Sequence, residues 1–386
     1  MHYVHRSLFP FIKNQLKSNP VVALLGPRQC GKSTLARELL KNIPNTVFLD
    51  LEKASDLNKL NDVWSFFNAN KGRLICLDEI QLKPELFRQM RSYVDEVGEN
   101  QQFLVLGSAS RDLIKQSSET LAGRISYIEI TPFMLPEVKQ IMSVDKLWLY
   151  GGFPRSCLKA SIEESSIWRE NYIKTFLERD LPQLGFRVPS MVLNNFWKMC
   201  AHIQGQLLNS TKLGTSLGVS SNTIKNYLHI LEETFMIRLL QPYHENLKKR
   251  LVKSPKIYIR DTGIVHTLLG IENFNDLLGH PVYGFSFESL VIENLIRLYP
   301  RHTPYFYRTA KGHELDLILL KGKEKLAFEI KASTTPKVED GFWKAIEDVQ
   351  PTKTVVIARV DEPYPLHKDI MAYNILDYID SVRPDT

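Results

Sequence analysis

The sequence predicts an α/β fold along its whole length, and three observations carry that prediction. Near the start, a strand-like apolar run leads into Gly-x-x-x-x-Gly-Lys-Ser and then into a helical pattern, within Leu24 to Ala36. Further apolar runs of strand length alternate with helical segments up to residue 130. In the last third, an acidic helical stretch precedes two strands that carry Asp316 and Glu329. Strands that alternate with helices in this way are typical of α/β domains.

The composition is typical of a globular protein that acts in a reducing compartment. The 386 residues are 44% hydrophobic and 24% charged, and no apolar run reaches the roughly 18 residues that a membrane span requires. The four cysteines lie far apart and form no Cys-x-x-Cys pair, which argues against a zinc site or a disulfide framework. We therefore expect a cytoplasmic protein with no membrane partner. The net charge of +6 mildly favours a polyanionic partner.

The first motif is a phosphate-binding loop between a strand and a helix. Val21 to Leu25 is a continuous apolar run, and leucines at helical spacing follow Lys32. The backbone N–H groups of such a loop and the N-terminus of its helix hold the phosphates of ATP. Lys32 would reach the β- and γ-phosphates, and the Ser33 hydroxyl would bind Mg²⁺. The expected nucleotide contacts are Gly26, Pro27, Arg28, Gln29, Cys30, Gly31, Lys32, Ser33 and Thr34.

A second strand ends in two carboxylates. The apolar run Leu74 to Leu77 is followed by Asp78 and Glu79. We expect Asp78 to support the Mg²⁺ ion and Glu79 to act as the general base that polarises the attacking water. The alternative is an acidic strand end that faces solvent. The spacing from the loop favours the site, because it leaves room for one intervening strand, Thr46 to Asp50, and one helix.

Two further polar residues stand beside predicted strands. Ser108 follows the apolar strand Phe103 to Leu106, and its hydroxyl is placed to hydrogen-bond the γ-phosphate or the attacking water. Arg124 directly precedes the strand Ile125 to Ile130. An arginine near the γ-phosphate stabilises the charge of the transferring phosphoryl group. The alternative for Arg124 is a surface cation or a structural ion pair.

This succession of motifs resembles the AAA+ ATPases. The resemblance implies that Ser108 is the sensor-1 residue and that Arg124 is an arginine finger for the neighbouring subunit, with Arg111 as the second candidate. A finger that acts between subunits implies a homo-oligomeric ring, with a hexamer favoured. Gly152-Phe153-Pro154 looks like the element that begins the helical lid in some of these ATPases and there lies near adenine, which implies a nucleotide contact for Pro154. Taken alone, these residues indicate only a turn and a helix start.

The whole chain resembles a large prokaryotic family of AAA-type ATPases whose C-terminal region has a poorly defined function. The resemblance extends essentially from end to end. The motifs that carry it are "GPRQCGKSTLA", "ICLDEIQ", "GSAS", "LAGR", "GGFP" and "RDTGIVHTLLG". The first four belong to the predicted ATPase core, and the last two identify the family better than they identify an activity.

The segment Leu207 to Tyr243 predicts a helix-turn-helix followed by a strand. Apolar residues recur at i, i+3, i+4 and i+7 in the second helix, and two strand-like runs then flank a basic tip, which together predicts a winged helix. Its positive charge favours contact with DNA phosphates. The alternatives are a protein-binding module or one that packs on its own ATPase domain, and Glu232 and Glu233 would repel phosphate. The candidate DNA contacts are Lys225, Asn226, His229, Lys248, Lys249, Arg250 and Lys253.

The last third predicts a second acidic constellation. Glu288 lies in a helical stretch, Asp316 in a strand, and Glu329 and Lys331 in the next strand, on one face of it by the two-residue period. This order resembles the PD-(D/E)XK nuclease fold. Asp316 and Glu329 suit a shared Mg²⁺ ion, completed by Glu288, while Lys331 would position the attacking water. The alternative is a domain that keeps this fold for structure or for holding DNA without cleavage.

These motifs predict four regions and a leading function. The regions are an AAA+ P-loop core at 1–133, a helical lid at 134–190, a winged helix at 191–262 and a PD-(D/E)XK-like domain at 263–386. The expected function is ATP hydrolysis coupled to the binding or remodelling of duplex or branched DNA. One alternative is a signalling or regulatory switch with slow turnover and protein-binding C-terminal domains. Another is a nuclease in which ATP only gates access.

Overall fold

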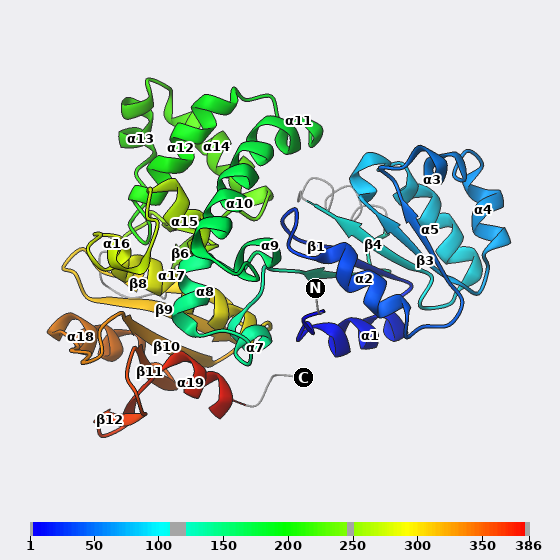
Figure 1. Cartoon of the computed structure of the whole chain (residues 1–386). Helices are drawn as coiled ribbons and strands as arrows, with labels where there is room; N and C mark the ends of the chain where they lie inside the picture. The colour runs from blue at the N-terminus through cyan, green and yellow to red at the C-terminus, as the bar shows by residue number, and fades with distance from the viewer. Residues whose placement is uncertain (1–2, 109–120, 245–250, 383–386) are drawn as a thin grey trace. The chain divides into compact units, whose positions relative to one another are not determined.

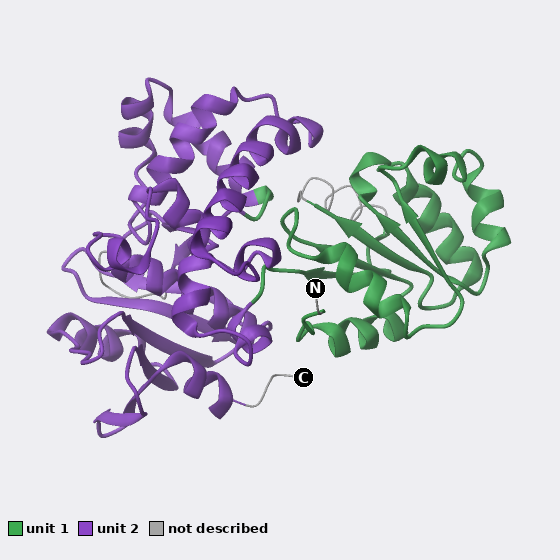
Figure 2. Cartoon of the chain, in the orientation of Figure 1, with its two compact units in different colours: residues 1–133, 233–235 green, residues 134–232, 236–386 purple. Residues whose placement is uncertain are grey.

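The chain divides into two compact units (Figure 2). The computed structural model describes residues 3–108, 121–244 and 251–382. Unit 1 holds residues 1–133 and 233–235, and unit 2 holds 134–232 and 236–386. The three regions expected after residue 133 therefore pack as one unit. Within the described ranges, no helix combines the length and the apolar character that a bilayer crossing requires.

A parallel five-stranded sheet forms the centre of unit 1 (Figure 1). Its strand order is β2-β3-β4-β1-β5, and every neighbouring pair is parallel. The five strands expected from the apolar runs are all present, with ends that differ by at most one residue. They are β1 (Val21–Leu25), β2 (Thr46–Asp50), β3 (Leu74–Asp78), β4 (Phe103–Gly107) and β5 (Ile125–Glu129).

Helices cover both faces of this sheet, and the side chains of β1 alternate between the two cores. Val21, Ala23 and Leu25 join the apolar cluster that includes the α4 and α5 side chains, while Val22 and Leu24 join the cluster on the α1 and α2 side. A strand buried on both faces explains why β1 is a continuous apolar run rather than an alternating one. The helical segments of unit 1 are α1 (Phe9–Ser18), α2 (Lys32–Leu40), α3 (Ala54–Asn58), α4 (Val63–Ala69), η1 (Ile80–Leu82) and α5 (Leu86–Val97).

Unit 2 begins with a helical region. Side-chain caps fix several helix starts: Ser161 accepts a hydrogen bond from the Glu164 N–H group, and Asn209 accepts one from the Lys212 N–H group. The helices are α7 (Leu135–Val138), α8 (Val144–Tyr150), α9 (Pro154–Cys157), α10 (Ile162–Thr175), the π-helix η2 (Phe176–Asp180), α11 (Leu181–Gln183), α12 (Ser190–His202), α13 (Ser210–Leu217) and α14 (Ser221–Glu233).

An eight-stranded mixed sheet forms the second half of unit 2, in the order β12-β13-β11-β10-β9-β8-β6-β7. Its strands are β6 (Ile237–Pro242), β7 (Lys256–Ile259), β8 (Thr303–Arg308), β9 (Glu314–Lys321), β10 (Glu324–Lys331), β11 (Lys353–Ala358), β12 (Tyr364–His367) and β13 (Ile370–Tyr373). The remaining helices are α15 (Thr262–Leu268), α16 (Phe274–Leu278), α17 (Tyr283–Leu298), α18 (Asp340–Val349) and α19 (Ile375–Ser381).

One strand joins the two C-terminal regions that the sequence analysis separates. The first four residues of β6 pair with β7 in an antiparallel hairpin, and its last two, Gln241 and Pro242, pair with β8 in parallel. The hairpin expected to belong to a winged helix is thus the edge of the C-terminal sheet. A boundary at 262/263 does not separate two sheets, because β6 and β7 lie before it and their neighbour β8 lies after it.

Candidate nucleotide site and C-terminal polar clusters

The phosphate-binding loop joins β1 to α2, as the sequence predicts, and close contacts fix its shape. A Cβ atom on Gly26 would lie 2.0 Å from the Ile130 carbonyl oxygen, so only glycine fits there. Gly31 caps α2 with a φ of 102°, a conformation that glycine adopts without strain. The Arg6 guanidinium donates to the carbonyl oxygens of Cys30 and Thr131.

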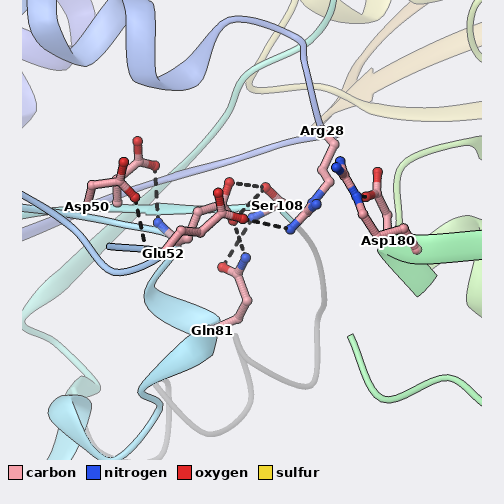
Figure 3. A network of polar contacts seen from close by, with 9 residues as sticks. Arg28, Asp50, Glu52, Gln81, Ser108 and Asp180 are labelled. Carbon is pink, nitrogen blue, oxygen red and sulfur yellow. Dashed lines mark hydrogen bonds and ion pairs between the residues drawn. The ribbon is translucent and has the colours of Figure 1, made fainter. Parts of the chain in front are cut away.

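The loop's lysine is buried and bonded to neutral groups. Lys32 Nζ donates to the carbonyl oxygens of Gly26 and Pro27, each at 2.9 Å. Among the described residues its hydrogen-bond partners are these backbone carbonyls, and its positive charge is directed into the loop. Arg28 lies 3.4 Å from Glu52 in an ion pair that Figure 3 shows. Of the other loop residues, Cys30 and Pro27 are buried, Ser33 is half-buried, and Gln29 and Thr34 are exposed.

Asp78 lies at the end of β3 and contacts the loop. Burial raises the pKa of Asp78, and a hydrogen bond with Ser33 opposes that shift. The hydroxyl and the carboxylate expected to share Mg²⁺ are therefore adjacent. Asp50, the register partner of Asp78 on β2, adds a second nearby carboxylate that the sequence analysis does not select. Oxygen donors of this kind, completed by phosphate oxygens and water, fit Mg²⁺.

Glu79 is held by two side chains. Its backbone has a φ of 57°, an uncommon conformation for a residue with a side chain. The Ser108 hydroxyl lies 3.0 and 2.9 Å from the two carboxylate oxygens, and Gln81 donates its amide N–H to the same carboxylate. The Gln81 carbonyl in turn lies 3.4 Å from the Ser108 backbone nitrogen. Figure 3 shows Gln81 and Ser108 with these contacts.

This cluster brings together the predicted base and the predicted polar residue and adds one residue that sequence reasoning missed. Ser108 contacts the carboxylate of Glu79, whereas the sequence analysis expects it to face phosphate or water. Gln81 lies two residues after Glu79, in the short 3₁₀-helix η1, which turns its side chain back toward β4. The sequence "DEIQ" contained a signal, since a tight turn after a strand end brings positions i and i+2 together.

Arg124 lies at the opposite end of the sheet from the loop. Its backbone carbonyl accepts from the Val21 N–H group at the start of β1, whereas the loop follows the end of β1. Its guanidinium makes a two-pronged ion pair with Asp95 of α5, with the Nη2–Oδ2 distance at 3.1 Å. This ion pair is the structural alternative considered for Arg124, and it leaves the side chain one-third exposed. The second finger candidate, Arg111, lies outside the described residues.

The "GGFP" and "RDTG" motifs contact each other within unit 2. The Gly152 N–H group donates to Asp261 Oδ2 at 2.7 Å, while Asp261 Oδ1 caps α15 by accepting from Ile264. A Cβ atom on Gly151 would lie 2.2 Å from the Asp261 carboxylate. Pro154, the predicted adenine contact, begins α9 and is half-buried. Its role at the nucleotide stays a prediction.

The second helix of the helix-turn-helix pattern presents a polar face. In α14, Ile224, Leu228 and Leu231 are buried, while three candidate DNA contacts on the same helix are exposed: Lys225, Asn226 and His229. Lys225, His229 and Lys253 line one open pocket of about 590 Å³, together with the start of α13 and Glu232. The other basic candidates, Lys248, Lys249 and Arg250, lie outside the described residues.

All four residues of the second acidic constellation lie within electrostatic reach of one another in unit 2. Burial raises the pKa of Glu329 to about 8, and the neighbouring charges of Asp316 and Glu288 raise it too. Lys331 Nζ lies 2.7 Å from Glu329 Oε1 on the same face of β10. Asp316 Oδ2 accepts a hydrogen bond from the Ile330 N–H group at 2.9 Å.

A fifth residue, Lys256 of β7, occupies the centre of this cluster, and sequence reasoning missed it. Its Nζ lies 3.2 Å from Glu288, 2.9 Å from Glu314 and 3.6 Å from Asp316. Tyr258 donates to Glu288 as well. Across the described ranges, no three His, Cys, Asp or Glu side chains are grouped so that they could hold a metal ion. Lys256 Nζ therefore contacts two of the carboxylates, Glu288 and Asp316, that the nuclease-like pattern assigns to Mg²⁺, and the Mg²⁺ site itself stays a prediction.

Comparisons with known proteins cover most of the chain. A model of an AAA domain matches residues 18–139, and models of two domains of unknown function, DUF8612 and DUF4143, match 141–275 and 283–378. Uncharacterized proteins of Mycobacterium tuberculosis (Rv2008c) and Mycobacterium bovis (Mb2031c) are each 39% identical over 361 residues, which cover 94% of this chain and 81% of theirs. A solved structure, the Walker-type ATPase PABY2304 of Pyrococcus abyssi, is similar with a TM-score of 0.46 and 15% identity, covering 69% of this chain and 96% of that chain.

The match to the AAA domain spans the loop, β3 and β4, which carry the nucleotide-site residues described above. The likeness to the mycobacterial proteins continues through both units. The chain therefore belongs to the family of these mycobacterial proteins, and its N-terminal unit is an AAA-type P-loop ATPase domain.

Proposed function

We propose that the protein hydrolyses ATP and couples the reaction to binding or remodelling of duplex or branched DNA. The observation that carries the hydrolytic part is the convergence of two carboxylates, a hydroxyl and an amide beside the phosphate-binding loop. Asp78 contacts Ser33 of the loop, and Glu79, the next residue, is oriented by Ser108 and Gln81. A base fixed in this way can act on a water molecule at the γ-phosphate.

Each residue of the loop has a definite task in this proposal. The backbone N–H groups from Arg28 to Ser33 hold the phosphates, and Lys32 exchanges its two carbonyl partners for phosphate oxygens. Ser33 and Asp78 hold Mg²⁺, which neutralises charge on the phosphate oxygens when bound. Glu79 orients the attacking water and takes its proton. Ser108, which hydrogen-bonds Glu79, sets the direction of that carboxylate.

The proposed DNA surface is the pocket beside α14. Lys225 of this helix and Lys253 line the same pocket as His229. The pocket volume of about 590 Å³ is large enough for a phosphate group with its sugar. Exposed lysines neutralise phosphates and release counterions, which makes such binding depend steeply on salt. In this proposal the region 191–262 acts as a winged helix, 134–190 as the lid and 263–386 as a nuclease-like module that holds DNA.

The proposal includes a homo-oligomeric ring, with a hexamer favoured, in which Arg124 completes the neighbouring subunit's site. Arg124 lies at the far end of its own sheet from its own loop, as a residue that acts between subunits must. To act there, the guanidinium would exchange Asp95 for a phosphate oxygen. An exposed ion pair of this kind contributes only about 0–1 kcal/mol to stability, so losing it costs little free energy.

A second candidate function is a nucleotide-dependent switch with slow turnover whose C-terminal unit binds protein. The observation that favours it is Glu232, an acidic residue that lines the same pocket and would repel phosphate. A switch of this kind would hydrolyse ATP at a rate that DNA does not change.

The deciding experiment measures ATPase rate and DNA affinity together. The rate is recorded with and without duplex and four-way-junction DNA at several salt concentrations, with Glu79→Gln as the variant that binds ATP but does not turn over. We expect stimulation by DNA, and affinity that falls linearly on a log–log plot against salt. Lys225→Ala and Lys253→Ala should each flatten that slope by about 1.

The control for these variants is Lys13→Ala, which removes an exposed lysine from α1 in the other unit. A rate that DNA leaves unchanged, with no salt-dependent binding, would favour the switch. Hydrolysis by Glu79→Gln at the parent rate would instead show that another residue is the base.

A further inference from the structure

The acidic cluster of unit 2 is built around a cation that belongs to the chain. Lys256 extends from β7 into a space bounded by α17 and β9, where Glu288, Glu314 and Asp316 lie 2.9 to 3.6 Å from its ammonium nitrogen. Only 3% of the lysine side chain is exposed. A buried ammonium is stable only when carboxylates or other acceptors replace its lost water, and this one has three carboxylates.

The electrostatics of the cluster keep the lysine charged. Burial alone lowers the pKa of Lys256, and the charges of Glu288, Asp316 and Glu314 outweigh burial and raise that pKa well above its usual value. Glu288 is shared further, because Tyr258 also donates a hydrogen bond to it. The backbone holds the lysine in place as well, through a bridge between Leu207 and Lys256 and the pairing of β7 with β6.

We infer that Lys256 takes the position of the divalent cation in this nuclease-like centre, so that the chain itself supplies the cation and the cluster binds no catalytic metal. A hard divalent cation needs the same carboxylate oxygens that the ammonium contacts. It would also have to sit beside a fixed positive charge. Without the ion, Glu329 and Lys331 lack the group that would activate water and stabilise a leaving phosphate.

Within the described part of the chain, one carboxylate oxygen of the cluster is left without a partner, as a metal ligand would be. Glu329 Oε2 is buried and has no hydrogen-bond partner among the described residues. A single such oxygen is too few for a metal site, since the neighbouring Oε1 is bonded to Lys331. Removing the ammonium should free the oxygens of Glu288 and Asp316 to join it. The inference thus predicts that one substitution creates a metal site.

The experiment compares Mn²⁺ binding in the presence and absence of Lys256. All variants carry Asp78→Asn, which weakens binding at the nucleotide site, and no nucleotide is added. We expect no tight Mn²⁺ binding by this background protein. Adding Lys256→Met should yield about one bound Mn²⁺ per chain by calorimetry, together with a Mn²⁺-dependent rise in the melting temperature. Adding Asp316→Asn should abolish both, and Lys323→Met, an exposed turn lysine, should create neither.

A second pair of variants decides the matter if Lys256→Met folds poorly. Lys256→Met combined with Glu288→Gln removes one positive and one negative charge together, so it should recover most of the lost melting temperature. Tight Mn²⁺ binding by the background protein that Asp316→Asn removes would overturn the inference. Equal stability of Lys256→Met with and without Glu288→Gln, in the absence of metal, would overturn it as well.

Discussion

The two polar centres of the molecule both place a lysine and carboxylates beside buried strands, but they pair them differently. In unit 1, Lys32 bonds to backbone carbonyls, and Glu79 bonds to the uncharged groups of Ser108 and Gln81. In unit 2, Lys256 bonds directly to carboxylates. Charges that have only neutral partners can be transferred to a ligand at low cost, whereas charges that neutralise each other in a buried place act as structure.

The largest effect expected from this difference is that of removing each lysine. Lys32→Ala should abolish nucleotide binding, because the charge that faces the β- and γ-phosphates is lost, while the melting temperature of the protein changes little. Lys256→Met should do the reverse, leaving nucleotide affinity intact and lowering the melting temperature. Nucleotide titration and thermal unfolding of both variants check this pair. Equal loss of stability in the two would contradict the comparison.

The next effect concerns Arg124, which is paired with a carboxylate as Lys256 is, but is partly exposed. Arg124→Ala should reduce turnover by ~10³-fold or more with nucleotide affinity nearly unchanged, since a finger acts on charge in the transition state. Asp95→Ala should leave turnover at or above the parent rate, because it releases the arginine. If the ion pair is only structural, both variants should lose stability alike and keep their turnover. Mixing Arg124→Ala with Glu79→Gln subunits should restore some activity if the site is shared.

A stability effect follows from Glu293 of α17, a neutralised charge in unit 2. Burial raises the pKa of Glu293, but Arg238 and Arg260 outweigh burial and lower that pKa to about 2. The carboxylate therefore stabilises the fold at pH values above the ordinary glutamate pKa of about 4.5. This contribution is lost as the pH falls toward 2. Glu293→Gln should cost about 3 kcal/mol at pH 7 and little at pH 2.

Chemical unfolding across this pH range measures the difference between the parent protein and Glu293→Gln. Glu272→Gln, at an exposed position before α16, is the matched control and should behave as the parent does. A deficit of Glu293→Gln that stayed constant from pH 7 to pH 2 would mean that packing, rather than charge, explains the loss.

The smallest effect expected is that of Gln81, which acts through Glu79. Gln81→Ala should lower kcat about tenfold with nucleotide affinity unchanged, well below the ~10²–10⁴-fold that loss of the base itself can cost. Single-turnover hydrolysis and nucleotide titration separate the two quantities. Gln89→Ala, an exposed glutamine of α5, provides the control. A drop in affinity without a change in kcat would mean that Gln81 supports the loop rather than the base.

The elements that form the candidate nucleotide site were largely predictable from the sequence, because they are local. The loop, β1 and the carboxylates at the end of β3 can each be identified from a few neighbouring residues. Parallel strands then bring their carboxyl ends to one edge of the sheet. What could not be predicted were the partners chosen across the sheet. Nothing near Arg124 indicates Asp95, and the hydrogen bond of Ser108 to Glu79 depends on the register of β3 and β4.

The acidic cluster shows the same limit more clearly. The order of Glu288, Asp316 and Glu329 was readable, and these residues do lie together. Lys256 could not be read as their partner, because its strand belongs by pattern to the preceding helix-turn-helix segment. Only the pairing of β6 with both β7 and β8 brings that strand to the edge of the later sheet.

That shared sheet limits how the chain can be divided or exchanged. A recombination junction placed between β7 and α17 would deliver a C-terminal module in which β8 has lost its neighbour β6, with Glu288 and Asp316 left without Lys256. The upstream fragment would carry Lys256 without the carboxylates that neutralise its charge. We therefore expect a transplant between homologues to fold only when it moves β6 and β7 together with the strands from β8 onward.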